Sequence, residues 1–227
     1  ACFARHLISL LVFCRRRLRR LVPPAILTLV LVLAAAPAWM GPEAQARLGA
    51  DAVGSLFYFV NWRFVQAEYG YALIFAGPSL LQHYWSLAIE GQFYLVLPLL
   101  LMVSLRAKRP LRVFTASVIL LIVAGVATSL VLGSDPEGYD RVYYGTDTRA
   151  PEFLVGVLLA LGLWSRRGKP EPQPHLLRDL AGWIGLAALF VAFAWVPLRG
   201  DLLYQGGFAA FALVSALVIA ACVGGCS

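Results

Sequence analysis

Long apolar stretches separated by shorter polar ones dominate this chain of 227 residues. The stretches are rich in leucine and alanine, and apolar and polar residues do not alternate along them as they would in the strands of a membrane barrel. Because a helix needs about 20 predominantly apolar residues to cross a bilayer, the pattern predicts an all-α protein, a polytopic transmembrane helical bundle of about six spans. The predicted spans are Leu21–Met40, Ser86–Leu105, Val113–Leu132, Pro151–Trp164, Leu180–Val196 and Leu202–Val223.

Two apolar stretches are shorter than a bilayer requires. The first, Pro151–Trp164, is expected to belong to a helix that begins further upstream. The second, Ala52–Trp62, is predicted to form a short interfacial or re-entrant helix instead of a span. Residues 165–179 are polar and contain several prolines, which is typical of a linker.

The composition favours a membrane protein over a soluble one. Hydrophobic residues make up 60% of the chain and charged residues 14%, whereas soluble domains contain about 45–50% and about 25%. Because the apolar stretches recur from end to end, residues 1–227 are predicted to form a single, partial membrane domain. The net charge of +7 comes without an aromatic and basic platform, so no nucleic acid is expected as a partner. The cysteines lack metal-ligand spacing, and no metal site is expected.

Lysine and arginine gather in three segments, residues 15–20, 106–112 and 166–178. Such segments stay on the cytoplasmic side of a membrane. All three can share that side only if residues 41–85 do not cross the bilayer, so residues 41–85 are predicted to be extracytoplasmic. Residues 1–20 then form a basic cytoplasmic approach to the first span.

Polar side chains gather where the second predicted span begins. Glu90 lies about one turn inside this span, together with Gln92 and Tyr94. An ionisable group within a span costs about 2.5–3.5 kcal/mol, so such a residue is a candidate for function. Ser86 shares a helical face with Glu90 at i, i+4, and His83, whose usual pKa of about 6.5 suits proton transfer, precedes the helix.

Each of these residues also has a structural interpretation. Glu90 could pair with Arg149 for packing, although Arg149 and Glu152, at i, i+3, are expected by default to pair with each other, since an unpaired charge there is costly. Tyr94 could belong to the aromatic belt at the level of the lipid headgroups, and His83 could be an interfacial polar residue. The residue pattern alone leaves these alternatives open.

The segment His83–Tyr94, followed by Pro98, closely resembles the H-x-W-S-L-x-x-E-x-Q-F-Y-x-x-x-P signature of the acyltransferase 3 family of bacterial membrane proteins. Three other stretches resemble further motifs of that family. Phe13–Pro23 resembles its arginine-rich helix entry, Ser55–Trp62 its surface segment ending in Asn-Trp, and Thr148–Gly156 its T-R-x-x-E-x-x-x-G helix entry. These stretches are spaced across most of the chain.

The resemblance implies a membrane-bound O-acyltransferase in the inner membrane of a bacterial cell. Members of this family move an acyl group, commonly acetyl, from acyl-CoA to a hydroxyl of an extracytoplasmic glycan, lipid-linked sugar or similar acceptor. The expected donor substrate is therefore acetyl-CoA, without a permanently bound cofactor, and the expected partners are membrane lipids, acyl-CoA and the carbohydrate acceptor. The expected catalytic residues are Glu90, Ser86, Gln92, Tyr94 and His83.

Arginines at the start of the first span are the candidates for donor binding. Arg17 and Arg20 are the outer members of an R-x-x-R sequence. Because guanidinium groups match the geometry of phosphate oxygens, these two, with Arg16, are expected to bind the phosphates of CoA. An anchor on anionic lipid is an equally good interpretation of this cluster.

The chain departs from the family pattern in several places. The opening helix that carries the family's favoured catalytic histidine does not appear, nor do the second helix and the C-terminal end. Gly91 stands where the family often has a second glutamate. The chain is therefore expected to be a fragment that is inactive alone.

A transporter or flippase subunit that does not transfer acyl groups is the alternative function. Such a protein should show paired broken helices in its two halves. No internal repeat of that kind is seen in the sequence, which favours the acyltransferase.

Overall fold

The computed structural model describes residues 2–66, 79–167, 175–197 and 200–224. The described residues form helices and turns and contain no strand, which confirms the predicted all-α class. The chain divides into two compact units, Ala1–Phe114 and Thr115–Ser227. They are called the N-terminal and the C-terminal unit below, and each is described by itself.

Five of the described helices are long and apolar enough to cross a membrane. These candidate spans are Arg15–Ala38, Tyr84–Ser104, Pro110–Leu132, Leu176–Trp195 and Leu203–Val223, and each overlaps a span predicted from the sequence. The remaining predicted span lies in helix α8 (Thr146–Arg166). This helix begins upstream of Pro151, as expected, but carries Asp147, Arg149 and Glu152 near its start and is not among the five.

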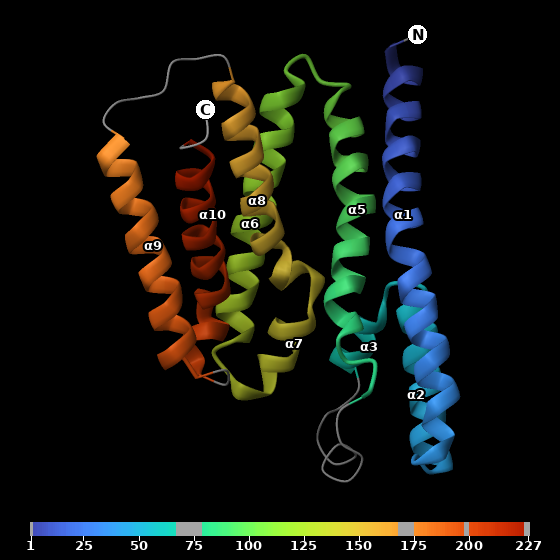
Figure 1. The fold of residues 1–227 in the computed structure, drawn as a ribbon. Coiled ribbons are helices and arrows are strands. Elements are labelled where there is room, and N and C mark those ends of the chain that lie inside the picture. The colour runs from blue at the N-terminus through green and yellow to red at the C-terminus, as the bar shows by residue number, and fades with distance from the viewer. Residues whose placement is uncertain (1, 67–78, 168–174, 198–199, 225–227) are drawn as a thin grey trace. The chain divides into compact units, whose positions relative to one another are not determined.

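The N-terminal unit is built on two long helices. Helix α1 (Cys2–Ala35) and helix α5 (Tyr84–Ser104) run in opposite directions side by side (Figure 1). The short 3-10 turn η1 (Ala36–Ala38) ends α1, and α2 (Pro42–Leu56) then runs back beside it. Helix α3 (Val60–Gln66) packs against both α2 and α5.

Residues 2–20, the predicted basic approach, are helical and continuous with the span that follows. One expectation for this unit needs correction, because Ala52–Trp62 is not a single short helix. The chain turns between α2 and α3, where Tyr58 has φ of 58°, and a left-handed residue ends an α-helix.

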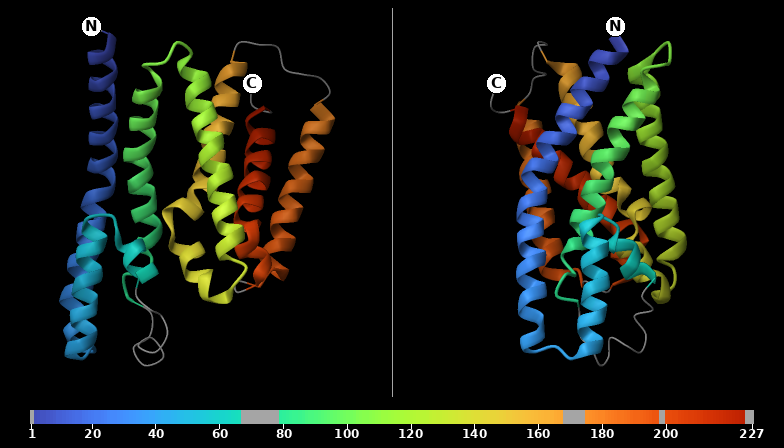
Figure 2. Two further views of the ribbon diagram at one scale, coloured as in Figure 1. Left: turned by 180° about the vertical axis from the view of Figure 1, so that it is seen from behind. Right: turned by 90° about the vertical axis from the view of Figure 1, so that its right-hand side faces the viewer.

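Helix α6 (Pro110–Leu132) begins in the N-terminal unit and lies mostly in the C-terminal one. The 3-10 turn η2 (Pro136–Gly138), the short helix α7 (Tyr139–Tyr144) and α8 follow it. Helix α9 (His175–Trp195), the π-helical turn η3 (Leu203–Gly207) and α10 (Phe208–Gly224) complete the C-terminal unit. Helix α10 packs against both α8 and α9 (Figure 2).

Residues around α7 and η3 hold one end of the C-terminal unit together. Val142, Leu203 and Tyr204 form a buried cluster there. The Tyr139 ring stacks on Tyr204 with 4.0 Å between centroids, and the Tyr139 hydroxyl donates a hydrogen bond to the carboxylate of Asp201. This bond to Asp201 raises the pKa of Tyr139 to about 12.

Candidate functional site

Glu90 and Tyr94 lie one turn apart on the same face of α5. The Tyr94 hydroxyl donates a hydrogen bond to Glu90 Oε1, and both side chains are half-buried. Tyr94 is the middle residue of this 21-residue helix. The polar pair therefore lies deep along the span and not at the end of the helix, where an aromatic belt would lie.

Arg17 of α1 lies against this pair. Its guanidinium is 5.1 Å from the centroid of the Tyr94 ring, and Arg20 is also close enough to act electrostatically on the Tyr94 phenol. One further contact fixes the register of the two antiparallel helices, because the Tyr84 hydroxyl donates to the carbonyl of Ala25 over 2.7 Å. Arg17 is half-buried, whereas its neighbour Arg16 is exposed.

Tyr58 completes the cluster from the turn between α2 and α3. A Cβ atom on Gly91 would collide with the ring of Tyr58, so the aromatic ring rests directly on the glycine. Burial raises the pKa of Tyr58 above its usual value, and nearby Tyr84 and Glu90 raise it further. The left-handed backbone of Tyr58 is uncommon for a bulky residue and stores strain, a feature that often marks functional sites.

Gln92 connects α5 to the same turn. Its Nε2 atom donates to the carbonyl of Tyr58 over 2.7 Å and to Oδ1 of Asn61 over 2.9 Å. Asn61 is completely buried. Gln92 thus holds the turn that carries Tyr58 against α5. Its contribution to the site around Glu90 therefore runs through the position of Tyr58.

This role gives a stability prediction. In a Gln92→Glu variant, a carboxylate oxygen would replace the donating nitrogen and face two acceptor oxygens. We expect the variant to be less stable by about 1–3 kcal/mol, the cost of leaving buried polar groups unsatisfied. Thermal unfolding in detergent micelles measures the change, and Gln66→Glu at the exposed end of α3 is the matched control. Equal midpoints for the two variants would contradict this role of Gln92.

The structure places two predicted residues at the rim of this cluster. His83 is exposed and immediately precedes α5. Ser86 is also exposed, and its hydroxyl donates to the carbonyl of His83 over 3.2 Å. Although Ser86 shares a helical face with Glu90, the described partner of Glu90 is Tyr94. The catalytic roles of His83 and Ser86 stay predictions.

The pairing of Glu90 with Arg149 is not what the structure shows. Arg149 Nη1 donates to Glu152 Oε1 over 2.7 Å, and its Nε donates to the carbonyl of Tyr143 over 2.9 Å. The guanidinium also lies over the Phe208 ring, 3.7 Å from its centroid. The structural charge pair is therefore Arg149–Glu152, inside the C-terminal unit.

Sequence reasoning singled out Glu90, Tyr94 and Arg17 but missed Tyr58 and Asn61. Both lie in the stretch that resembles the family's surface segment, yet nothing in the sequence shows that this stretch folds back onto α5. For metals, the described residues contain no group of three or more His, Cys, Asp or Glu side chains that could share an ion. The expectation of no metal site stays a prediction.

Known proteins match this chain over almost its whole length. The peptidoglycan O-acetyltransferase OatA of Listeria monocytogenes is 36% identical over 211 residues, which cover 90% of this chain and 33% of the relative. The O-acetyltransferase OatA of Staphylococcus aureus is 33% identical over 222 residues, 95% of this chain and 36% of the relative. The chain spans about a third of the length of these curated relatives. No solved structure matches it.

A match over nearly the whole chain confirms the resemblance seen in the motifs. A family model described as an acyltransferase domain matches residues 2–226. That match includes α1, α5 and the turn that carries Tyr58, and so contains the whole cluster around Glu90. The chain therefore belongs to the acyltransferase 3 family.

Proposed function

We propose that this chain is the membrane part of an O-acyltransferase that moves an acetyl group from acetyl-CoA to a hydroxyl of an extracytoplasmic glycan. Two of its relatives are named as O-acetyltransferases, and one of these as acting on peptidoglycan. A hydroxyl of peptidoglycan is therefore the proposed acceptor. The cluster of Glu90, Tyr94, Arg17 and Tyr58 is the proposed reaction site.

The contact between Arg17 and the polar pair of α5 is the observation that carries the proposal. The guanidinium of Arg17 lies 5.1 Å from the centroid of the Tyr94 ring, and Tyr94 donates to Glu90. Because guanidinium groups match the geometry of phosphate oxygens, a phosphate of CoA bound by Arg17 would bring the donor next to the proposed reaction site.

The antiparallel arrangement of α1 and α5 supports entry of acetyl-CoA from the basic end of the N-terminal unit. Helices α1 and α5 are antiparallel, so the N-terminal part of α1 and the basic loop 106–112 lie toward the same end of the N-terminal unit (Figure 1). We assign this end to the cytoplasm on the basis of its lysines and arginines. The acceptor would then approach from the opposite end, where α2 and α3 lie.

In the proposed reaction, the acceptor oxygen forms a bond to the acetyl carbonyl carbon and the carbon–sulfur bond of the thioester breaks. The hydroxyl proton passes to a base and finally to the thiolate of CoA, so the products are an acetyl ester and free CoA. Glu90 is suited to orient the acceptor hydroxyl or a base, because its carboxylate is held by Tyr94 inside the helical bundle. Tyr94 and Arg17 supply a donor and a positive charge next to it.

The test uses the full-length protein reconstituted in liposomes with acetyl-CoA and peptidoglycan fragments. We expect acetyl transfer by the wild type and a KM for acetyl-CoA about tenfold higher in Arg17→Gln and Arg20→Gln variants, since each loses a charged contact to phosphate. Arg15→Gln, an exposed arginine of the same cluster, is the matched control.

Equal KM values in the Arg17 and Arg15 variants would contradict the donor site. Movement of a lipid-linked sugar without acetyl transfer would contradict the activity itself, and would favour a transporter.

A further inference from the structure

A groove separate from the proposed reaction site runs between α8 and α10 in the C-terminal unit. Its volume is about 330 Å³, which falls at the lower end of the range for ligand pockets, about 300–1,000 Å³. On α8, its lining residues Glu152, Gly156 and Leu159 recur every three to four positions and so lie on one helical face. On α10, they extend from Phe208 to Ile219, a distance of about 16 Å along the helix axis.

Gly156 keeps this groove open. A Cβ atom on Gly156 would meet no other atom within 4 Å, so the space above it is empty. The opposite wall on α10 contains small residues, Ala212 and Ala216. Apart from Glu152 and Ser215, the lining side chains are apolar, which suits an aliphatic chain lying parallel to the two helices.

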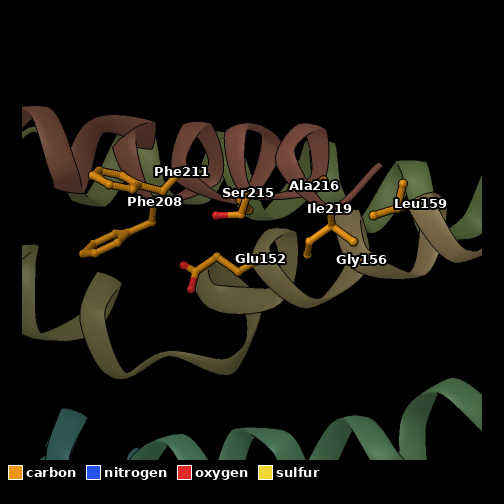
Figure 3. Close-up of a pocket in the computed structure, with 9 residues that line it drawn as sticks. Glu152, Gly156, Leu159, Phe208, Phe211, Ser215, Ala216 and Ile219 are labelled. Atoms are coloured by element: carbon orange, nitrogen blue, oxygen red, sulfur yellow. The ribbon is translucent and has the colours of Figure 1, made fainter. Parts of the chain in front are cut away.

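The polar groups lie between an aromatic and an aliphatic part of the groove. Figure 3 shows the Glu152 carboxylate and the Ser215 hydroxyl between the rings of Phe208 and Phe211 on one side and Ile219 and Leu159 on the other. Glu152 lies in the second turn of α8 and Ser215 near the middle of α10. A ligand that fits this order has its polar group at Glu152 and Ser215 and an aliphatic chain that runs past Gly156 toward Ile219.

The two polar residues of the groove, Glu152 and Ser215, favour a particular chemistry in the polar group of the ligand. Arg149 donates to Glu152 Oε1 and so balances the carboxylate charge. The Oε2 atom can still accept a hydrogen bond, and the Ser215 hydroxyl can donate or accept one. A neutral hydroxyl satisfies both groups, whereas an anionic head would have to compete with Glu152 for Arg149.

From these features we infer that the groove binds an aliphatic chain with a neutral hydroxyl head, as in a fatty alcohol or a neutral glyceride of the membrane. The inference rests on the C-terminal unit alone and does not depend on the proposed acetyl transfer. The chain would lie against Gly156 and the face of α10, and the head would bind Glu152 and Ser215.

The experiment labels the full-length protein in detergent with a dodecanol that carries a photoreactive diazirine, and mass spectrometry then identifies the labelled peptides. We expect labels on peptides that contain Gly156 and residues 208–219, and competition by dodecanol that is stronger than by dodecanoate. In a Gly156→Leu variant the labelling should fall about tenfold, because the leucine side chain would occupy the groove.

Gly162→Leu is the matched control, since Gly162 also lies on α8 with open space around it but does not line the groove. A Ser215→Ala variant should reduce the advantage of dodecanol over dodecanoate and leave the thermal midpoint unchanged. Equal labelling of the two leucine variants would overturn the inference. An unlabelled groove in the wild type would also overturn it, and would indicate that another part of the full-length protein covers this face.

Discussion

Replacing Glu90 by glutamine in the full-length protein is expected to lower kcat for acetyl transfer about a hundredfold or more, the usual contribution of a positioned acid or base. The substitution removes the negative charge but keeps an oxygen that can accept the hydrogen bond from Tyr94. The variant should therefore keep its fold. Steady-state kinetics with acetyl-CoA and a peptidoglycan acceptor, together with the thermal unfolding midpoint, measure both properties.

Glu43→Gln is the matched control for this variant, because Glu43 is an exposed carboxylate in the first turn of α2. It should retain the wild-type kcat. If Glu90→Gln transferred acetyl groups as fast as the wild type, Glu90 would have no role in the reaction, although the family membership would stand. A variant that lost activity and unfolded at a lower temperature would indicate a role in packing instead.

The largest loss of stability is expected for Arg149→Met. Arg149 is 5% exposed and bonds both to Glu152 and to the carbonyl of Tyr143. Its guanidinium also lies 3.7 Å from the centroid of the Phe208 ring. Methionine can fill part of the volume, but it leaves the carboxylate of Glu152 without its cation. Breaking a buried pair costs about 3–5 kcal/mol, and because the Glu152 side chain is 31% exposed, we expect a loss at the lower end of that range.

Arg141→Met provides the comparison, because Arg141 also pairs with a carboxylate nearby. Its Nη2 atom lies 2.7 Å from Oδ2 of Asp147, whose side chain is 46% exposed. An exposed pair contributes only about 0–1 kcal/mol. Unfolding of both variants by denaturant in the same micelles measures the difference in the free energy of unfolding. Equal destabilisation would show that burial does not increase the contribution of the Arg149 ion pair to stability.

The fold class followed from the sequence because a bilayer imposes a length and an apolar composition on any helix that crosses it. That constraint is local, so five candidate spans overlap predicted ones. The extent of helix α1 did not follow in the same way. Arginines favour helix formation almost as strongly as leucine does, and the helix therefore continues through residues 2–20, where only the hydropathy changes.

The contacts of Glu90 and Arg149 follow in part from helical spacing. Glu90 shares a face with Ser86, as expected, but a residue in a helix has neighbours at both i−4 and i+4, and the structure shows the bond to Tyr94. Arg149 and Glu152, at i, i+3, were expected to pair by default, and the structure confirms this pair. The alternative pairing of Arg149 with Glu90 is not the one that the structure shows.

The sequence by itself determined the all-α membrane class, the family, and Glu90, Tyr94 and Arg17 as residues of interest, because each depends on residue type and short spacing. Only the tertiary structure decided that Tyr58 rests on Gly91, that Gln92 holds Asn61, and that Arg17 lies beside the middle of α5. These contacts join segments far apart in the chain, and their geometry depends on the register of packed helices, which a single sequence does not specify.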